Sequence, residues 1–148
     1  MLKSSINAEA KKKGKSRAIC RYISEKYASQ GNIKLYGINP LEKASIEQWI
    51  EAESQSFNPP LGSLSKEKLA KVLDVYDRRL GESRYLAGDD FTLADLSHLP
   101  NAQYLVNGTD VGELFTSRDN VGRWWEEISS RESWKKVVEM QSSSFPKS

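Results

Sequence analysis

The stretch FTLADL, residues 91–96, carries the strongest local structural signal in this chain of 148 residues. Thr92 is placed to cap the N-terminus of a helix, and Asp95, at the third helical position, can accept a hydrogen bond from the Thr92 N–H in return. Asp95 also suits the positive end of the helix dipole. Phe91 before the cap and Leu96 after it have the pattern of a hydrophobic staple. We therefore predict that a helix begins directly after Thr92 and that Pro100 kinks it rather than ends it.

Apolar residues also recur at helical spacing on both sides of this helix. Ser45 and Gln48 have the spacing of a capping box for one helix, which the prolines after Phe57 end. Gly81 is expected to end the next. That helix is expected at 65–80, and further helices are expected at 16–27, 121–128 and 134–140, with a loop at 107–117. No segment alternates as a strand does, so the predicted fold class is all-α, a bundle of about six helices.

Composition excludes several classes of protein. Hydrophobic residues make up 38% and charged residues 28%, as in an ordinary globular protein. The longest apolar runs are too short to span a bilayer, and no secretory signal is evident, so we expect no membrane association and a cytoplasmic location. Residues 1–30 have a net charge of +6 and the remainder −4. Because no aromatic platform accompanies these lysines, we interpret them as a solvated tail and expect no nucleic-acid partner.

Few residues are candidates for chemistry. His98 is the only histidine, which argues against a metal site and favours a surface or partly packed helix residue. Cys20 is the only cysteine and is interpreted as a small buried residue. Asp89 and Asp90 are expected in a loop. The four tryptophans have the spacing of core residues on helices, with a ligand pocket as the alternative.

Several segments together resemble the C-terminal half of a cytosolic glutathione transferase, most closely the plant phi class. The most specific is YLAGDDFTLADLSHLPNAQYLV (85–106). The others are SRAICRYISEKY (16–27), SIEQWIEAESQSFNPP (45–60), KLAKVLDVYDRRL (68–80) and NVGRWWEEISSRESWKKVV (120–138). The resemblance implies conjugation of glutathione, as cosubstrate, to small hydrophobic electrophiles, with no other cofactor and no metal. It also implies a homo- or heterodimer.

The resemblance further implies a division of the chain. Residues 1–14 are expected to be a disordered basic tail, 15–30 the remnant last helix of a thioredoxin-like domain, 31–42 a linker and 43–148 the helical domain. In this family the thioredoxin-like half holds most of the glutathione site, including a serine that favours the thiolate. This sequence lacks that region, so no catalytic residue is assigned.

One part of the glutathione site is matched. Where the family pattern reads Glu-Ser-Arg-Ala-Ile, this chain reads Lys15-Ser16-Arg17-Ala18-Ile19. Ser16 matches and is the glutathione-binding candidate. Lys15 replaces the acid that would pair with the α-ammonium of glutathione, so we interpret Ser16 as a remnant. The segment between Phe57 and Lys68 is shorter than the long hairpin usual in the family, which removes part of the electrophile pocket wall and of the dimer contact.

Three functional interpretations stay open on the sequence alone. The first is glutathione conjugation, with Trp49 and Phe57 as candidates for the hydrophobic pocket and weak or no activity for a truncated chain. The second is a non-catalytic ligand-binding or protein-interaction module, because loss of the thioredoxin-like half would expose an apolar face. The third is a truncated gene product or an incomplete gene model with no function of its own.

Overall fold

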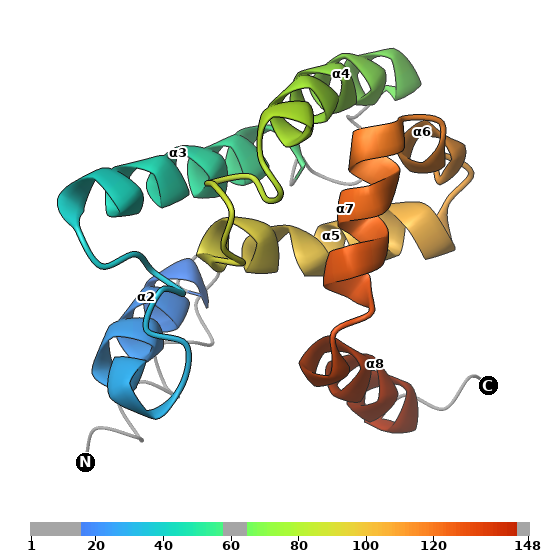
Figure 1. Cartoon of the computed structure of the whole chain (residues 1–148). Helices are drawn as coiled ribbons and strands as arrows, with labels where there is room; N and C mark the ends of the chain where they lie inside the picture. Colours follow the sequence, from blue (N-terminus) through green and yellow to red (C-terminus); the bar gives the residue numbers. More distant parts are fainter. Residues whose placement is uncertain (1–15, 58–64, 145–148) are drawn as a thin grey trace.

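The computed structural model describes residues 16–57 and 65–144, and its regular structure in these residues is helical (Figure 1). The α-helices are α2 (Ser16–Lys26), α3 (Pro40–Ser56), α4 (Lys66–Glu82), α5 (Leu93–Gly108), α6 (Glu113–Thr116), α7 (Asp119–Ser129) and α8 (Glu132–Ser144). A 3₁₀ turn, η1 (Ala28–Gln30), follows α2. Within the described ranges there is no strand beyond an isolated bridge between Tyr85 and Gly88. The all-α prediction is confirmed, with seven helices in place of about six.

Helix α5 is the centre of the fold and begins where the capping stretch predicts. The Ala94 N–H donates to Thr92 Oγ1 at 3.3 Å, and the Thr92 N–H donates to Asp95 Oδ2 at 3.1 Å, which completes a capping box. The helix then continues past Pro100 to Gly108. Its first turns are buried, and α3 and α7 pack on it (Figure 1).

The core forms from the apolar stripes of α3, α4, α5 and α7. For its length, α7 contributes more buried apolar residues than α3, α4 or α5, because its apolar residues recur at i, i+3, i+4 and i+7. Its buried residues are Val121, Trp124, Trp125 and Ile128. Trp49 and Trp134 are half-buried against the same core. The prediction of tryptophans as core residues is therefore confirmed for Trp124 and Trp125 and holds in part for the other two.

Helix α3 begins earlier than the expected capping box at Ser45. Asn39 is the N-cap: its side chain accepts a hydrogen bond of 3.0 Å from the Glu42 N–H, and Pro40 follows at the first helical position. Proline suits that position because the missing N–H has no helical partner there. Ser45 lies inside the helix, where its hydroxyl donates to the Ala87 carbonyl at 3.3 Å. The prediction that Ser45 caps this helix was wrong, because Asn39 and Pro40 provide an earlier N-terminus in the same stretch.

Two further boundaries differ from the expectation. Gly81 does not end α4, which runs to Glu82. A Cβ at Gly81 would lie 3.3 Å from Nδ2 of Asn120, so this glycine permits the close approach of α7. The expected loop at 107–117 contains the short helix α6, which the buried Phe115 anchors. Both differences come from tertiary packing, which single-helix patterns do not contain.

No helix in residues 16–57 and 65–144 is long and apolar enough to cross a membrane. The expected tail at 1–14, the helix-ending prolines after Phe57 and most of the shortened hairpin lie outside the described residues.

Candidate functional site

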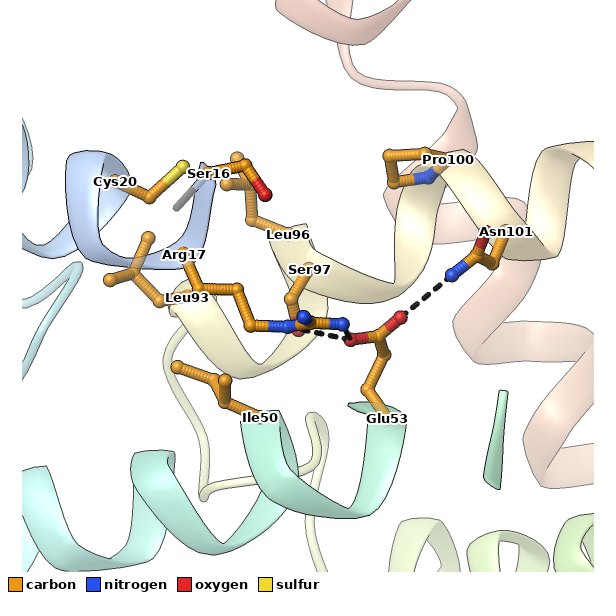
Figure 2. Close-up of a pocket in the computed structure, with 10 residues that line it drawn as sticks. All are labelled: Ser16, Arg17, Cys20, Ile50, Glu53, Leu93, Leu96, Ser97, Pro100 and Asn101. Atoms are coloured by element: carbon orange, nitrogen blue, oxygen red, sulfur yellow. Dashed lines mark hydrogen bonds and ion pairs between the residues drawn. The ribbon is translucent and has the colours of Figure 1, made fainter. Parts of the chain in front are cut away.

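A pocket of about 270 Å³ lies between the start of α2, the second half of α3 and the first half of α5 (Figure 2). Its lining residues are Ser16, Arg17, Cys20, Ile50, Glu53, Leu93, Leu96, Ser97, Pro100 and Asn101. The three helices come from segments far apart in the sequence, so only the tertiary structure assembles this pocket.

One wall is apolar and belongs mainly to α5. Leu93, Leu96 and Pro100 are spaced i, i+3 and i+7, which places them on one face of the helix. Ile50 of α3, which is 3% exposed, completes this wall. Such a surface favours the apolar body of a small molecule.

The other wall is an ion pair held by a buried carboxylate. Glu53 of α3 is 1% exposed, and Arg17 of α2 binds its Oε2 through Nη2 and through Nε at 3.1 Å. Asn101 of α5 donates from Nδ2 to Glu53 Oε1 at 2.7 Å. Figure 2 shows the guanidinium and the Asn101 amide approaching this carboxylate from different helices. Glu53 therefore ties α2 and α5 to α3 and keeps the Arg17 side chain extended along the pocket.

Arg17, Glu53 and Asn101 were not predicted as site residues. A signal for Glu53 was present, because it lies three residues after Ile50 and seven after Ile46, on the buried stripe of α3. An acid on an apolar stripe needs a partner. The sequence does not say which cation supplies it.

Ser16, the predicted glutathione-binding residue, lies at the first position of α2 and lines the pocket. It is exposed, and the N-terminal end of a helix around it offers N–H groups to an anion. Its neighbour Lys15 lies outside the described residues. The role of Ser16 stays a prediction.

Neither predicted hydrophobic-pocket residue lines this pocket. Phe57 is 4% exposed and packs in the core, with its ring centroid 5.1 Å from that of His98 and 6.1 Å from that of Phe115. Trp49 directs its ring at Tyr76, with the centroids 5.1 Å apart. One residue along a helix turns the side chain by about 100°, so Ile50 faces the pocket and Trp49 does not.

Neither the Cys20 thiol nor the Ser97 hydroxyl, which both line the pocket, is an activated nucleophile. Burial raises the pKa of the Cys20 thiol, an effect that the nearby Arg21 only partly offsets. A thiol with a raised pKa stays protonated at neutral pH, and the thiolate is the reactive form. Ser97 donates its hydroxyl hydrogen to the Ala94 carbonyl at 3.0 Å. The part of the chain that the structure describes also contains no group of three or more potential metal ligands.

His98 lies in the core, outside the pocket, and the expectation of a surface or partly packed residue was wrong. Its ring is 0% exposed, bonded through Nδ1 to the Ala94 carbonyl at 2.6 Å and through Nε2 to the Tyr76 hydroxyl at 2.8 Å. Burial lowers the pKa of His98 to about 4, so the ring is neutral at physiological pH. Because both ring nitrogens are satisfied, a histidine can occupy this core position.

Comparison with known proteins agrees with this architecture. The family described as glutathione S-transferase, C-terminal domain, matches residues 63–132. Glutathione S-transferase F11 of Arabidopsis thaliana is 44% identical over 146 residues, which cover 84% of this chain and 68% of that protein. The chain thus spans about two thirds of the length of the relatives it matches.

Solved structures show the same likeness in three dimensions. Glutathione transferase F2 from Populus trichocarpa superposes with a TM-score of 0.79 at 60% identity, covering 86% of this chain and 69% of that one. Glutathione S-transferase I from maize, solved with an atrazine glutathione conjugate, gives a TM-score of 0.71 at 32% identity over 84% and 66% of the two chains. With this sequence identity and a shared helical fold, the chain belongs to the glutathione S-transferase family and resembles its plant phi-class members.

Proposed function

We propose that this chain supplies the hydrophobic-substrate side of a glutathione transferase, which joins glutathione to small apolar electrophiles. The single observation that carries the proposal is the pocket between α2, α3 and α5, which Ser16 and an apolar wall both line. Membership of the transferase family favours this function over the interaction module.

The two walls suit the two parts of such a reaction. The apolar wall of Leu93, Leu96 and Pro100 accommodates the electrophile. The edge at Ser16 offers a hydroxyl and the N-terminal end of α2 to a carboxylate of glutathione. The maize relative was solved in complex with an atrazine glutathione conjugate, which supports this proposal.

The chemistry needs a glutathione thiolate. The sulfur attacks an electrophilic carbon of the second substrate, the carbon–sulfur bond forms and the leaving group departs with its electron pair. This step requires a group that lowers the pKa of the glutathione thiol. The Cys20 thiol and the Ser97 hydroxyl do not provide that group. We therefore propose that the 148 residues alone have weak activity or none, and that a thioredoxin-like half supplies the missing group.

The apolar side of α2 supports a further packing surface for such a half. No residue of α2 is fully buried, and Tyr22 and Ile23 of α2 and Tyr27 directly after it are 40%, 48% and 44% exposed. Exposed aromatic and aliphatic side chains close together in the chain mark an interaction surface.

A chimera tests the proposal. The thioredoxin-like half of the poplar F2 relative is joined to this chain before α2, and conjugation of a chloronitroarene to glutathione is followed by absorbance. We expect turnover from the chimera and little from the 148 residues alone. A folded chimera without turnover would contradict the transferase function. Equal turnover by the 148 residues alone would contradict the need for a second half.

Two matched variants test the pocket within the chimera. Leu96→Glu places a charge on the apolar wall, whereas Leu41→Glu places the same charge on a side chain that is 80% exposed and outside the pocket. We expect Leu96→Glu to lower kcat/KM for the chloronitroarene by roughly tenfold or more with the KM for glutathione unchanged. Leu96→Met is expected to keep activity. If both glutamate variants behave alike, the electrophile binds elsewhere.

Dimerisation and a cytoplasmic location are part of the same proposal. Sedimentation of the chimera tests the first, since a dimer has twice the mass of the chain. Fractionation of cells that express the tagged protein tests the second.

A further inference from the structure

A second hollow, of about 450 Å³, lies between the second half of α5, the end of α7 and α8. We name it the indole groove, because Trp125 and Trp134 both line it together with Gln103, Asn107, Lys135 and Val138. Its volume falls within the range typical of small-molecule sites, roughly 300–1,000 Å³.

The indole groove is separate from the pocket beside α2. Ser97 and Asn101 are four residues apart on α5 and line that pocket, whereas Gln103 and Asn107, also four residues apart, line the groove. Two residues along a helix turn the side chain by about 200°, so the two pairs lie on different faces of α5. In Figure 1, α2 lies by the start of α5, and α8 lies beyond α7.

The groove exists because α8 packs chiefly on α7 and leaves a space beside α5. One hydrogen bond crosses this space: the Trp134 Nε1–H donates to Gln103 Oε1 at 3.2 Å. That bond orients the indole of Trp134 and leaves its ring as a wall. Trp125 of α7 also lines the groove, but it is only 8% exposed, and its ring packs on Phe115 with the centroids 6.4 Å apart.

The polar groups of the groove select the ligand. Because Gln103 uses its oxygen to accept from Trp134, its amide N–H₂ stays available as a donor, and Asn107 offers a second amide. Lys135 at the rim is paired with Glu132 at 3.0 Å, and Glu139 adds a negative charge. Neither sign of charge dominates, which disfavours a strongly charged ligand.

We propose that the indole groove binds a neutral, planar aromatic molecule of about two fused rings with a carbonyl acceptor. The rings contact the indoles and Val138, and the carbonyl accepts a hydrogen bond from the Gln103 or Asn107 amide. Aromatic rings favour such offset or edge contacts with indoles. Binding here does not require glutathione, so it is independent of the conjugation reaction proposed above.

Coumarin has this chemistry and serves as the probe. The ¹⁵N-labelled 148-residue chain is titrated with coumarin, and the indole N–H resonances of its four tryptophans are followed by NMR. We expect saturable shifts at Trp125 and Trp134. Trp124, whose Nε1–H donates to Asp95 at 2.9 Å in the core, and Trp49, on α3, are internal controls that stay in place. Hexanol, an apolar molecule without a ring, is expected to shift none of the four indole N–H resonances.

Adjacent valines give a matched pair of variants. Val138 lines the groove, whereas Val137 is 39% exposed and does not. We expect Val138→Glu to weaken coumarin binding about tenfold or more and Val137→Glu to leave it unchanged. Asn107→Arg, on the α5 wall at an exposed position, is expected to fill the groove and to weaken binding without disturbing the core.

Three results would overturn the proposal. These are the absence of saturable shifts, shifts at Trp49 in place of Trp134, and equal binding by the two valine variants. If Val138→Glu fails to fold, Asn107→Arg decides the question instead. An unchanged Trp124 resonance in Asn107→Arg shows that this variant is folded. A failed conjugation assay in the chimera leaves this result unaffected, because the titration uses neither glutathione nor an electrophile.

Discussion

The carboxylate of Asp95 accepts a hydrogen bond of 2.9 Å from the indole Nε1–H of Trp124, 29 residues later in the chain. Both side chains are 0% exposed. The same carboxylate accepts from the backbone N–H groups of Leu86, at 3.2 Å, and Thr92, at 3.1 Å. One side chain therefore begins α5, holds the preceding turn and joins α5 to α7.

Loss of the Asp95 carboxylate is expected to destabilise the whole domain. Asp95→Ala leaves three N–H donors in the core without their acceptor, and each buried unsatisfied group costs about 1–3 kcal/mol. We expect the free energy of unfolding in urea to fall by about 3 kcal/mol or more. Asp89→Ala is the control, because Asp89 is exposed and accepts only a 3.4 Å bond from the Arg84 N–H. A similar loss of stability in both variants would show that the hydrogen bonds of Asp95 contribute no more than that of an exposed carboxylate.

Stability is expected to fall between pH 6.5 and pH 4 because of His98. Burial lowers the pKa of His98 in the folded chain to about 4 from its ordinary 6.5. In that window the unfolded chain takes up a proton that the folded chain does not, so unfolding becomes more favourable as pH falls. The full contribution is about 3 kcal/mol, lost below pH 4 and present above pH 6.5.

His98→Gln is the variant that isolates this contribution. Asp95, whose pKa burial raises, contributes in the opposite direction, but it is present in both proteins and cancels in the comparison. We expect urea titrations at a series of pH values to show a shallower slope between pH 4 and 6.5 for the variant. Parallel slopes would mean that His98 protonates as easily in the folded chain as in the unfolded one.

The Arg17–Glu53 pair is expected to show strong coupling. Glu53 is 1% exposed and Arg17 is 26% exposed, so solvent screens this pair only in part. A double-mutant cycle with Arg17→Ala and Glu53→Ala is expected to give a coupling energy of about 1–3 kcal/mol. The control cycle uses Lys34 and Asp90, which are 51% and 55% exposed and whose pair is expected to contribute below about 1 kcal/mol. Equal coupling energies in the two cycles would mean that solvent screens the Arg17–Glu53 pair as fully as the exposed pair.

Asn39, and not Ser45, is expected to determine where α3 begins. Asn39→Ala removes the side chain that accepts from the Glu42 N–H at 3.0 Å, which typically costs about 1 kcal/mol. Ser45→Ala removes a 3.3 Å bond to the Ala87 carbonyl inside the helix and is expected to cost about half as much or less. Urea denaturation measures both. A larger loss at Ser45 would favour the capping box that the sequence suggested.

Local patterns were sufficient for much of the fold. The start of α5 was predictable because Thr92 and Asp95 lie three residues apart and cap a helix through bonds within four residues. Helix α7 was predictable because its apolar spacing alone defines a buried stripe. The start of α3 was not, since Asn39 and Ser45 both have the chemistry of an N-cap. In the folded chain Asn39 is the cap, with Pro40 at the first helical position, whereas the Ser45 hydroxyl bonds the Ala87 carbonyl.

The candidate site was predictable only at Ser16, through resemblance to a known motif. Trp49 and Ile50 are both apolar and adjacent in sequence, and their rotation about α3 decides which one faces the pocket. Glu53 was not predicted, although it is an acid on an apolar stripe, and its partners Arg17 and Asn101 lie 36 and 48 residues away. Bonds across such separations depend on how whole helices pack.

The sequence by itself determined that residues 91–96 begin a helix, because a cap acts within one turn and its partners are neighbours in the chain. It also determined, by resemblance, the family to which that helix belongs. Only the tertiary structure decided that Asp95 reaches Trp124 on α7 as well as Thr92. That bond joins two helices. Its geometry follows from the packing of the entire core, which no local pattern contains.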